Sequence, residues 1–282
     1  MNSRLLLNLL LLVSIVIIGL FIVNTPDENE KNIIRLGGPD IDEIRNVVIQ
    51  REGLADIHVN KTDNQWQMSV PYKVAANNTA VNALLELGQA ISHSRFASSD
   101  KELRDYDLKP AKASLHLNDE EYLFGNIEHI NKRRYILKDN TIHLTTDLFY
   151  HRLRTNTESF ISSKLIPSAA NIKALKLPKL MLTRSSQGNW QVDGSEDDDT
   201  SISADAVQTL LDHWQHKQAI QVKPAQPLDN AQAVQFIFND DSTISFQVNK
   251  PGNELILLRS DLGLQYHLPA NAATDLLNLA KP

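Results

Sequence analysis

The sequence predicts an α+β protein in which an N-terminal transmembrane helix precedes two tandem repeats, each an antiparallel sheet with a packed helix. Three observations lead to this class. Residues 5–23 form one apolar run whose only polar side chains are Asn8 and Ser14. The rest of the chain mixes strand-like alternation with helical periodicity. The same order of elements then occurs twice along the chain.

The apolar run at residues 5–23 is predicted to cross a membrane. As a helix it reaches about 28 Å, close to the roughly 30 Å of a bilayer core. No small-x-small cleavage site follows the run, which favours a retained anchor over a cleaved signal. Arg4 precedes it and Lys31 and Arg35 follow it, so charge alone leaves the orientation open. The short tail before the run favours export of the body.

Composition limits the class of protein. Of the 282 residues, 42% are hydrophobic and 22% are charged, as in a chain that folds around a core. The formal net charge of −6 argues against nucleic acid as the main partner, because binding phosphates requires a basic surface. The chain contains no cysteine, which excludes disulfides and thiolate chemistry.

The chain divides into an anchor at residues 1–24, a polar linker at 25–40, and a first repeat at 41–166. The repeat begins with a strand at 41–50. Alternating polarity predicts a hairpin next, and Asn77 or Asn78 can cap the helix that follows it. The remaining elements of this repeat are the hairpin strands 57–61 and 65–70, strands at 113–117, 121–124, 134–137 and 142–144, and a short helix at 147–153.

The second repeat, at residues 167–282, follows the same plan. A hairpin with a Gly188-Asn189 turn is followed by an acidic loop, and Ser203 is a good N-cap for the next helix. Pro269 opens a terminal helix that reaches about residue 279. The strands are predicted at 180–184, 190–192, 234–238, 243–248, 254–258 and 265–268.

Spacing supports a duplication. Trp66 precedes His143 by 77 positions, and Trp190 precedes His267 by the same number. Helices with the pattern Val-x-x-Leu-Leu lie between each pair. A period near 124 residues is too long for a solenoid, so two copies of one small unit are expected. Trp66 and Trp190 each close a hairpin, and we expect both rings to be buried in the core.

Short motifs in the first repeat resemble a known family. They are Trp66, the helix around Leu84-Leu85, Tyr106-Asp107-Leu108-Lys109-Pro110, Phe124-Gly125 and Tyr135-Ile136-Leu137. This set is similar to the bacterial membrane-anchored proteins labelled domain of unknown function 4340, although the family commonly has Gly where this chain has Asp107. The resemblance implies a bacterial membrane-anchored protein; together with the expected export of the body, this predicts a single-pass protein of the bacterial inner membrane with its body in the periplasm. It implies an envelope role near transport components, and it supplies no catalytic residues.

Histidines are the first candidates for a site. His213 and His216 lie three apart on a predicted helix beside Asp212, a spacing that metal sites use. No further cluster of ligands completes such a site, so a solvated helix face is the preferred interpretation. His143 and His267 lie in alternating strands at matching positions, which is typical of structural sheet histidines.

Charged runs are the second candidates. Residues 196–199, Glu-Asp-Asp-Asp, lack the glycine and the distal glutamate of a calcium loop, which favours a solvated loop. Residues 132–134, Lys-Arg-Arg, lie at an expected hairpin turn, where an exposed turn or a lipid-headgroup contact both fit. Neither a nucleophile elbow nor a phosphate-binding glycine loop occurs. We therefore predict no catalytic, cofactor-binding or metal-binding residues.

Two functions remain open. The first is a noncatalytic, membrane-anchored envelope protein, held in the inner membrane by residues 5–23, that presents its duplicated repeats to a protein partner. This partner would belong to a membrane, transport or envelope assembly, and nucleic acid is excluded. The alternative is a small-ligand-binding protein or hydrolase that uses a groove between the repeats.

Overall fold

The computed structural model describes residues 3–24, 33–98, 100–167, 170–194 and 203–279, with the side chains of residues 3–9, 21–24 and 100–102 excepted. The protein is mostly β, with antiparallel sheets of nine and eight strands. Several of its helices are only six to eight residues long, so strand residues outnumber helical ones. The predicted α+β class is therefore wrong, because the sheets and not the helices supply most of the regular structure.

The first sheet has the strand order β4-β3-β2-β1-β6-β7-β8-β9-β5. Its strands are β1 (Asn46–Arg51), β2 (Ile57–Thr62), β3 (Gln65–Val70), β4 (Val74–Ala75), β5 (Ser94–Ala97), β6 (Ala113–Leu117), β7 (Glu120–Ile127), β8 (Arg133–Lys138) and β9 (Thr141–Thr146). All neighbouring strands are antiparallel.

The second sheet has the order β12-β11-β10-β14-β15-β16-β17-β13, which follows the first sheet strand for strand except that it has no counterpart of β4 among the described residues. Its strands are β10 (Ile172–Lys176), β11 (Met181–Arg184), β12 (Trp190–Asp193), β13 (Gln221–Pro224), β14 (Gln232–Phe238), β15 (Thr243–Asn249), β16 (Glu254–Arg259) and β17 (Leu264–Pro269). The predicted hairpins are confirmed, with Thr62 opposite Gln65 and Arg184 opposite Trp190.

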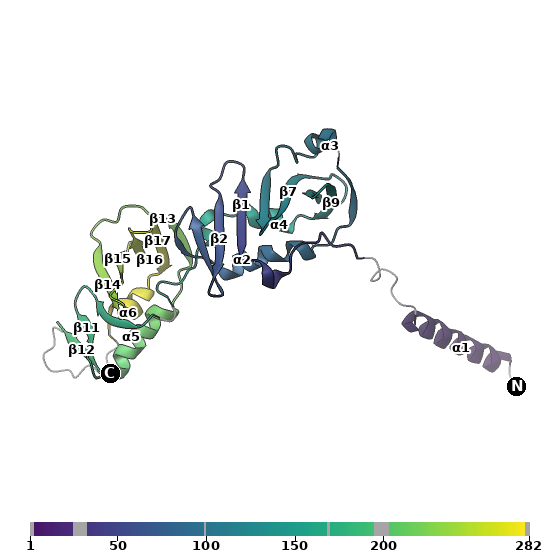
Figure 1. Cartoon of the computed structure of the whole chain (residues 1–282). Coiled ribbons are helices and arrows are strands. Elements are labelled where there is room, and N and C mark those ends of the chain that lie inside the picture. The colour runs from purple at the N-terminus through teal and green to yellow at the C-terminus, as the bar shows by residue number, and fades with distance from the viewer. Residues whose placement is uncertain (1–2, 25–32, 99, 168–169, 195–202, 280–282) are drawn as a thin grey trace.

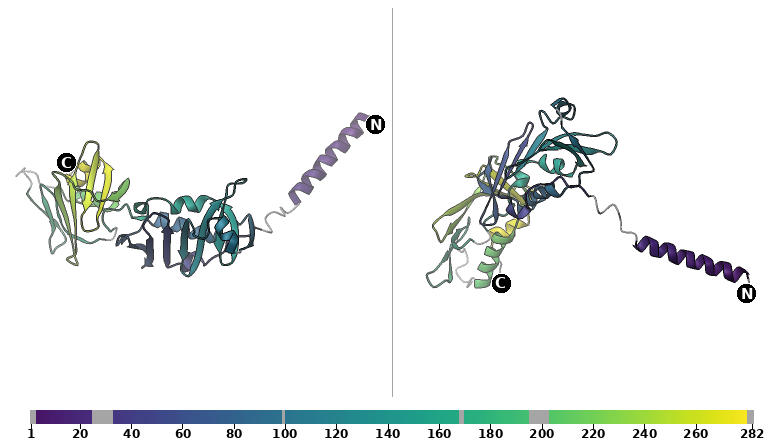
Figure 2. Two further views of the ribbon diagram at one scale, coloured as in Figure 1. Left: turned by 90° about the horizontal axis from the view of Figure 1, so that it is seen from above. Right: turned by 45° about the vertical axis from the view of Figure 1, so that its right-hand side comes forward.

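Helices pack on one face of each sheet, and the two sheets follow one another along the molecule (Figures 1 and 2). The first sheet carries α2 (Asn78–Leu85) and α4 (Leu148–Leu153), and the second carries α5 (Ala204–His216) and α6 (Ala272–Leu277). Asn77 caps α2 with its side-chain oxygen, and Ser203 caps α5 in the same way. The remaining helical pieces are α3 (Asp100–Asp105), η2 (Ile41–Glu43), η3 (Glu86–Gln89) and η4 (Thr157–Phe160).

The N-terminal helix α1 runs over Ser3–Asn24. Within the described part of the chain, no helix combines the length and the apolar character needed to cross a membrane. This finding contradicts the predicted transmembrane anchor and the predicted single-pass localisation in the inner membrane with a periplasmic body.

The end of the predicted linker is part of the folded body. Residues 25–32 lie outside the described residues, but Leu36 is only 4% exposed and its N–H donates to the Ala90 carbonyl at 2.9 Å. Arg35 forms an antiparallel bridge with Ile91, and Ser92 N–H donates to the Ile34 carbonyl. The segment entering the first sheet is thus docked against the chain that leads into β5. The boundaries predicted between the anchor, the linker and the two repeats stay a prediction.

Candidate functional site

The two sheets are joined by main-chain hydrogen bonds through the segment between them. Ile161 bridges Ala76 at the β4 edge of the first sheet, and Ser162 N–H donates to the Ala75 carbonyl at 2.9 Å. Further along the segment, Lys164 bridges Gln218, and Ala219 N–H donates to the Ser163 carbonyl at 2.9 Å. One extended segment therefore pairs with the β4 edge of the first sheet and with the chain that leads into β13 of the second.

Side chains reinforce this junction. Asn77 donates through its amide to the Ser159 carbonyl while its oxygen caps α2. The Ser163 hydroxyl donates to the Gln218 side chain at 3.0 Å. Tyr72 donates to Glu158, and the pKa of this tyrosine is raised by burial and by the nearby carboxylate. The hydrophobic residues of the connecting segment are each 2% exposed: Phe160, Ile161, Leu165 and Ile166.

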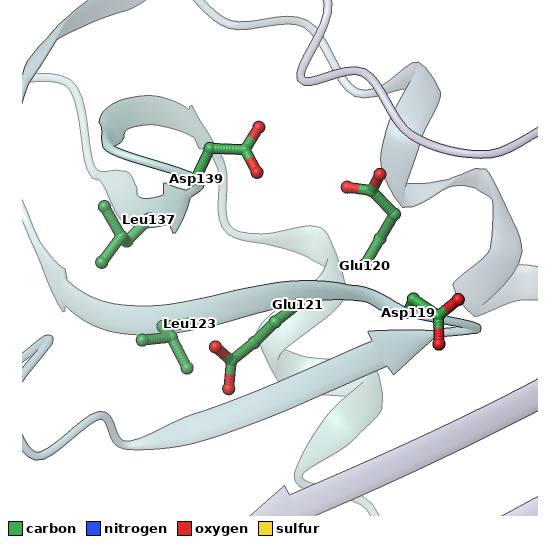
Figure 3. Close-up of a pocket in the computed structure, with 6 residues that line it drawn as sticks. All are labelled: Asp119, Glu120, Glu121, Leu123, Leu137 and Asp139. Carbon is green, nitrogen blue, oxygen red and sulfur yellow. The ribbon is translucent and has the colours of Figure 1, made fainter.

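A hollow lies on the first sheet, at β7 and β8 (Figure 3). Leu123 and Leu137, which face each other across β7 and β8, line it together with four acidic residues. Its volume is about 230 Å³. Three of the carboxylates already have partners, since Glu120 and Asp139 pair with Lys138 at 2.7 and 3.1 Å and Glu121 lies 3.5 Å from His116. The fourth acidic residue is Asp119.

A β-bulge interrupts strand β7 of the first sheet. The register of β7 against β8 shifts between Phe124 and Ile127, at Gly125 and Asn126. A bulge leaves main-chain groups without ladder partners. Here Asn126 N–H donates to the Tyr106 carbonyl at 2.7 Å, and the buried guanidinium of Arg134 donates to the Gly125 carbonyl.

Arg134 is the buried charge at this bulge. Its side chain is 5% exposed and forms a two-point ion pair with Asp147, the residue that precedes α4. The guanidinium also lies 3.5 Å from the ring centre of Tyr150. The sequence placed Arg134 in an exposed basic turn, but only Lys132 is exposed and Arg133 is half-buried. Along β8, Arg134 alternates with the same period as the buried Ile136. This alternation was the sequence signal that could have predicted a buried Arg134.

The family motif surrounds the same bulge. A side-chain carbon at Gly125 would lie 2.2 Å from the Tyr106 carbonyl oxygen, so this close contact requires glycine. Tyr106 stacks on Tyr135 with ring centres 4.3 Å apart, and Leu108 is buried at 2% exposure. The segment 106–110 is therefore fastened to β7 and β8 by the residues on which the resemblance was recognised.

A family model for the domain of unknown function DUF4340 matches residues 66–251. The chain belongs to this family. The match begins at Trp66 in β3 and ends at residue 251, so it includes most strands of both sheets and the segment that joins them, but not β1, β2, β16 or β17. No curated protein and no solved structure gave a significant match.

The tryptophans of this DUF4340 chain differ in their environments. Trp66 is 2% exposed, as predicted, and its indole donates to Asn82 on α2. Trp190 is only half-buried, so the prediction of a second buried hairpin tryptophan is wrong. The reason is topological, because β4 flanks β3 whereas β12 is the end strand of its sheet. Trp214 on α5 instead fills the second core, where it contacts Phe236 and Phe246.

The two matched histidines lie on opposite faces of their sheets. His143 is opposite Ile136, on the face that packs against the helices, and its Nδ1 lies 2.9 Å from the Ser92 hydroxyl. Burial lowers the pKa of His143. In the second sheet the helix-side position belongs to Tyr266, opposite the buried Leu257. His267 therefore points to the other face.

His267 lies in a short polar chain there. Its Nδ1 is 3.0 Å from Glu254 and its Nε2 is 3.0 Å from the Gln265 amide nitrogen. The hydrogen bond from His267 lowers the pKa of Glu254.

The other predicted candidates are dispersed. His213 Nδ1 lies 3.1 Å from the Asp275 carbonyl oxygen, which fixes α5 to α6, and His216 contacts the Asp212 carbonyl of its own helix. The acidic run at 196–199 lies outside the described residues. Within the described ranges, no group of three or more His, Asp or Glu side chains is arranged to hold a metal ion.

Proposed function

We propose that this DUF4340 protein is a noncatalytic binding protein that presents its two joined sheets to a protein partner. The observation that carries the proposal is the junction, where Ile161 pairs with Ala76 beside β4 and Lys164 pairs with Gln218 in the chain that leads into β13. A segment hydrogen-bonded to both sheets restrains their relative positions better than a free linker, so a partner can contact both at a small entropic cost.

The placement of the motif residues also supports this proposal. Tyr106, Gly125 and Tyr135 pack against one another around the bulge, where they stabilise the sheet. The net charge of −6 favours a protein partner over nucleic acid. At the predicted position of a ligand groove, between the repeats, the structure has main-chain pairing and buried apolar side chains. The proposal includes a bacterial origin of the protein, as the resemblance implies.

Photo-crosslinking in the native cell tests the proposal. A benzophenone amino acid would replace Gln50 on the first sheet or Gln247 on the second, two exposed strand positions. We expect both positions to crosslink to the same protein, identified by mass spectrometry and confirmed by reciprocal capture. An exposed position on the turn after β1, Glu52, serves as a control. No crosslinked protein from either sheet would contradict the proposal.

A further inference from the structure

Strand β5 (Ser94–Ala97) forms an outer edge of the first sheet. Its residues Ser94, Arg95 and Ala97 are exposed. An open edge displays main-chain donors and acceptors that can pair with another strand. The β4 edge of the first sheet is covered by the connecting segment, as described above, whereas β5 itself is paired on one side, with β9.

The register shows which groups of β5 are available. Ser98 N–H donates to the Asn140 carbonyl at 2.9 Å, and the pairing of Phe96 with Ile142 continues the same register. Residues along an antiparallel strand alternate between bonding the neighbour and facing away from it. The main-chain groups of Arg95 and Ala97 therefore face the free edge. Among the described residues, nothing hydrogen-bonds to these groups.

We propose that this edge of β5 binds an extended, acidic segment of a partner protein by strand addition, an inference that rests on the proposed function. The edge is basic, since Arg95 is exposed on it, His93 precedes it, and Arg35 lies beside the chain that leads into it. An acidic side chain opposite Arg95 would be a favourable cross-strand pair. The half-buried ring of Phe96 offers an apolar contact to a neighbouring residue of the added strand.

The molecule itself contains this kind of pairing. At the junction, residues 161–162 add to the β4 edge, and residues 163–164 add to the chain that precedes β13. Ahead of β5, the segment 34–36 pairs in the same way with residues 90–92. A second copy of β5 is a poorer occupant than an acidic strand, because two basic edges would then face each other.

Proline substitution provides a sharp test. Ala97→Pro removes an N–H that faces the free edge and leaves the bonds to β9 in place, because edge strands accept proline on the solvent side. Ala97→Ser retains the N–H and is the matched control. Phe96→Pro removes a bond to β9 and should destabilise the sheet, which checks the assigned register.

The probe is a short peptide of alternating valine and glutamate, and its binding to the full-length chain would be measured by fluorescence anisotropy. We expect at least ~10-fold weaker binding to Ala97→Pro than to wild type or Ala97→Ser, and weaker binding when lysine replaces glutamate in the peptide. Hydrogen exchange should slow at Arg95 and Ala97 when the peptide binds. Equal binding to Ala97→Pro, or protection elsewhere, would overturn the inference.

Two further results separate this inference from the proposed function. If crosslinks from Gln50 and Gln247 persist unchanged in Ala97→Pro, the protein has a partner but β5 does not bind it. If the chain sediments as a dimer that Ala97→Pro abolishes, the occupant is a second copy, and the acidic partner is wrong. Loss of both crosslinks in Ala97→Pro, with Ala97→Ser unaffected, is the supporting result.

Discussion

Breaking the ion pair between Arg134 and Asp147 should destabilise the protein strongly. The two side chains are 5% and 13% exposed, so Asp147→Ala would leave the guanidinium buried without its carboxylate. Removing one partner of a buried pair costs about 3–5 kcal/mol. A loss of 1 kcal/mol lowers the melting temperature of a domain of this size by about 2–4 °C, so we expect a drop of roughly 6–20 °C.

Urea unfolding followed by tryptophan fluorescence would measure the loss. Arg133→Ala, at the half-buried neighbouring position, is the matched control and should change stability by less than about 0.5 kcal/mol. The double variant Arg134→Met with Asp147→Ala removes both charges and should recover much of the loss. A cost below about 1 kcal/mol for Asp147→Ala, or a double variant as unstable as the single one, would refute this account of the bulge.

Three other predictions follow from the same structure. Trp66→Ala should cost about 3–5 kcal/mol. Trp190→Ala should cost less than about 2 kcal/mol, because its ring is only half-buried at the sheet edge. Equal losses in urea unfolding would contradict the assignment of β12 as the edge strand. Gly125→Ala should cost about 1–3 kcal/mol, since the new carbon would lie 2.2 Å from the Tyr106 carbonyl oxygen, and calorimetry would detect it as a lower melting temperature. Burial lowers the pKa of His143 below its unfolded value, so the unfolded chain binds more protons and stability should fall as the pH drops below about 6.5. His143→Gln should make the urea midpoint less dependent on pH between about 6.5 and 5, and an unchanged pH profile would show that another group is responsible.

The local elements were predictable because their causes are local. Alternating polarity identified the strands on either side of the Asp63-Asn64 turn, and the structure pairs them as a hairpin. Both turn residues have positive φ, a conformation that Asn and Asp adopt more readily than most residues. Asn77 and Ser203 cap the helices that follow them, as their hydrogen-bonding side chains indicated.

The environments of particular side chains were not predictable, because they depend on neighbours far along the chain. Trp66 and Trp190 occupy similar hairpin positions, yet only Trp66 has a further strand beside it. Trp214 lies on the buried face of α5, and its role as the centre of the second core depends on Phe236 and Phe246. The charge content of residues 132–134 likewise gave no sign that Arg134 turns inward.

His143 and His267 lie on opposite faces of their sheets because of a single inserted residue. Side chains alternate along a strand, so a slip of one position moves every following residue to the other side of the sheet. The bulge at Gly125 introduces such a slip in β7, and the pairing of β15 with β16 over Gln247–Asn249 has none. Equal spacing from tryptophan to histidine therefore places His143 toward the helices and His267 away from them.

The way the chain enters each sheet explains why the two sheets join. Ile34 accepts a hydrogen bond from Ser92 N–H at 2.8 Å, and Ser163 accepts the corresponding bond from Ala219 N–H at 2.9 Å. Leu36 and Leu165, each two residues further on, are both buried. Each sheet thus begins with an extended segment that pairs with the chain leading into its last strand. In the second sheet that segment also pairs with Ala76, so the junction uses an element that both sheets possess.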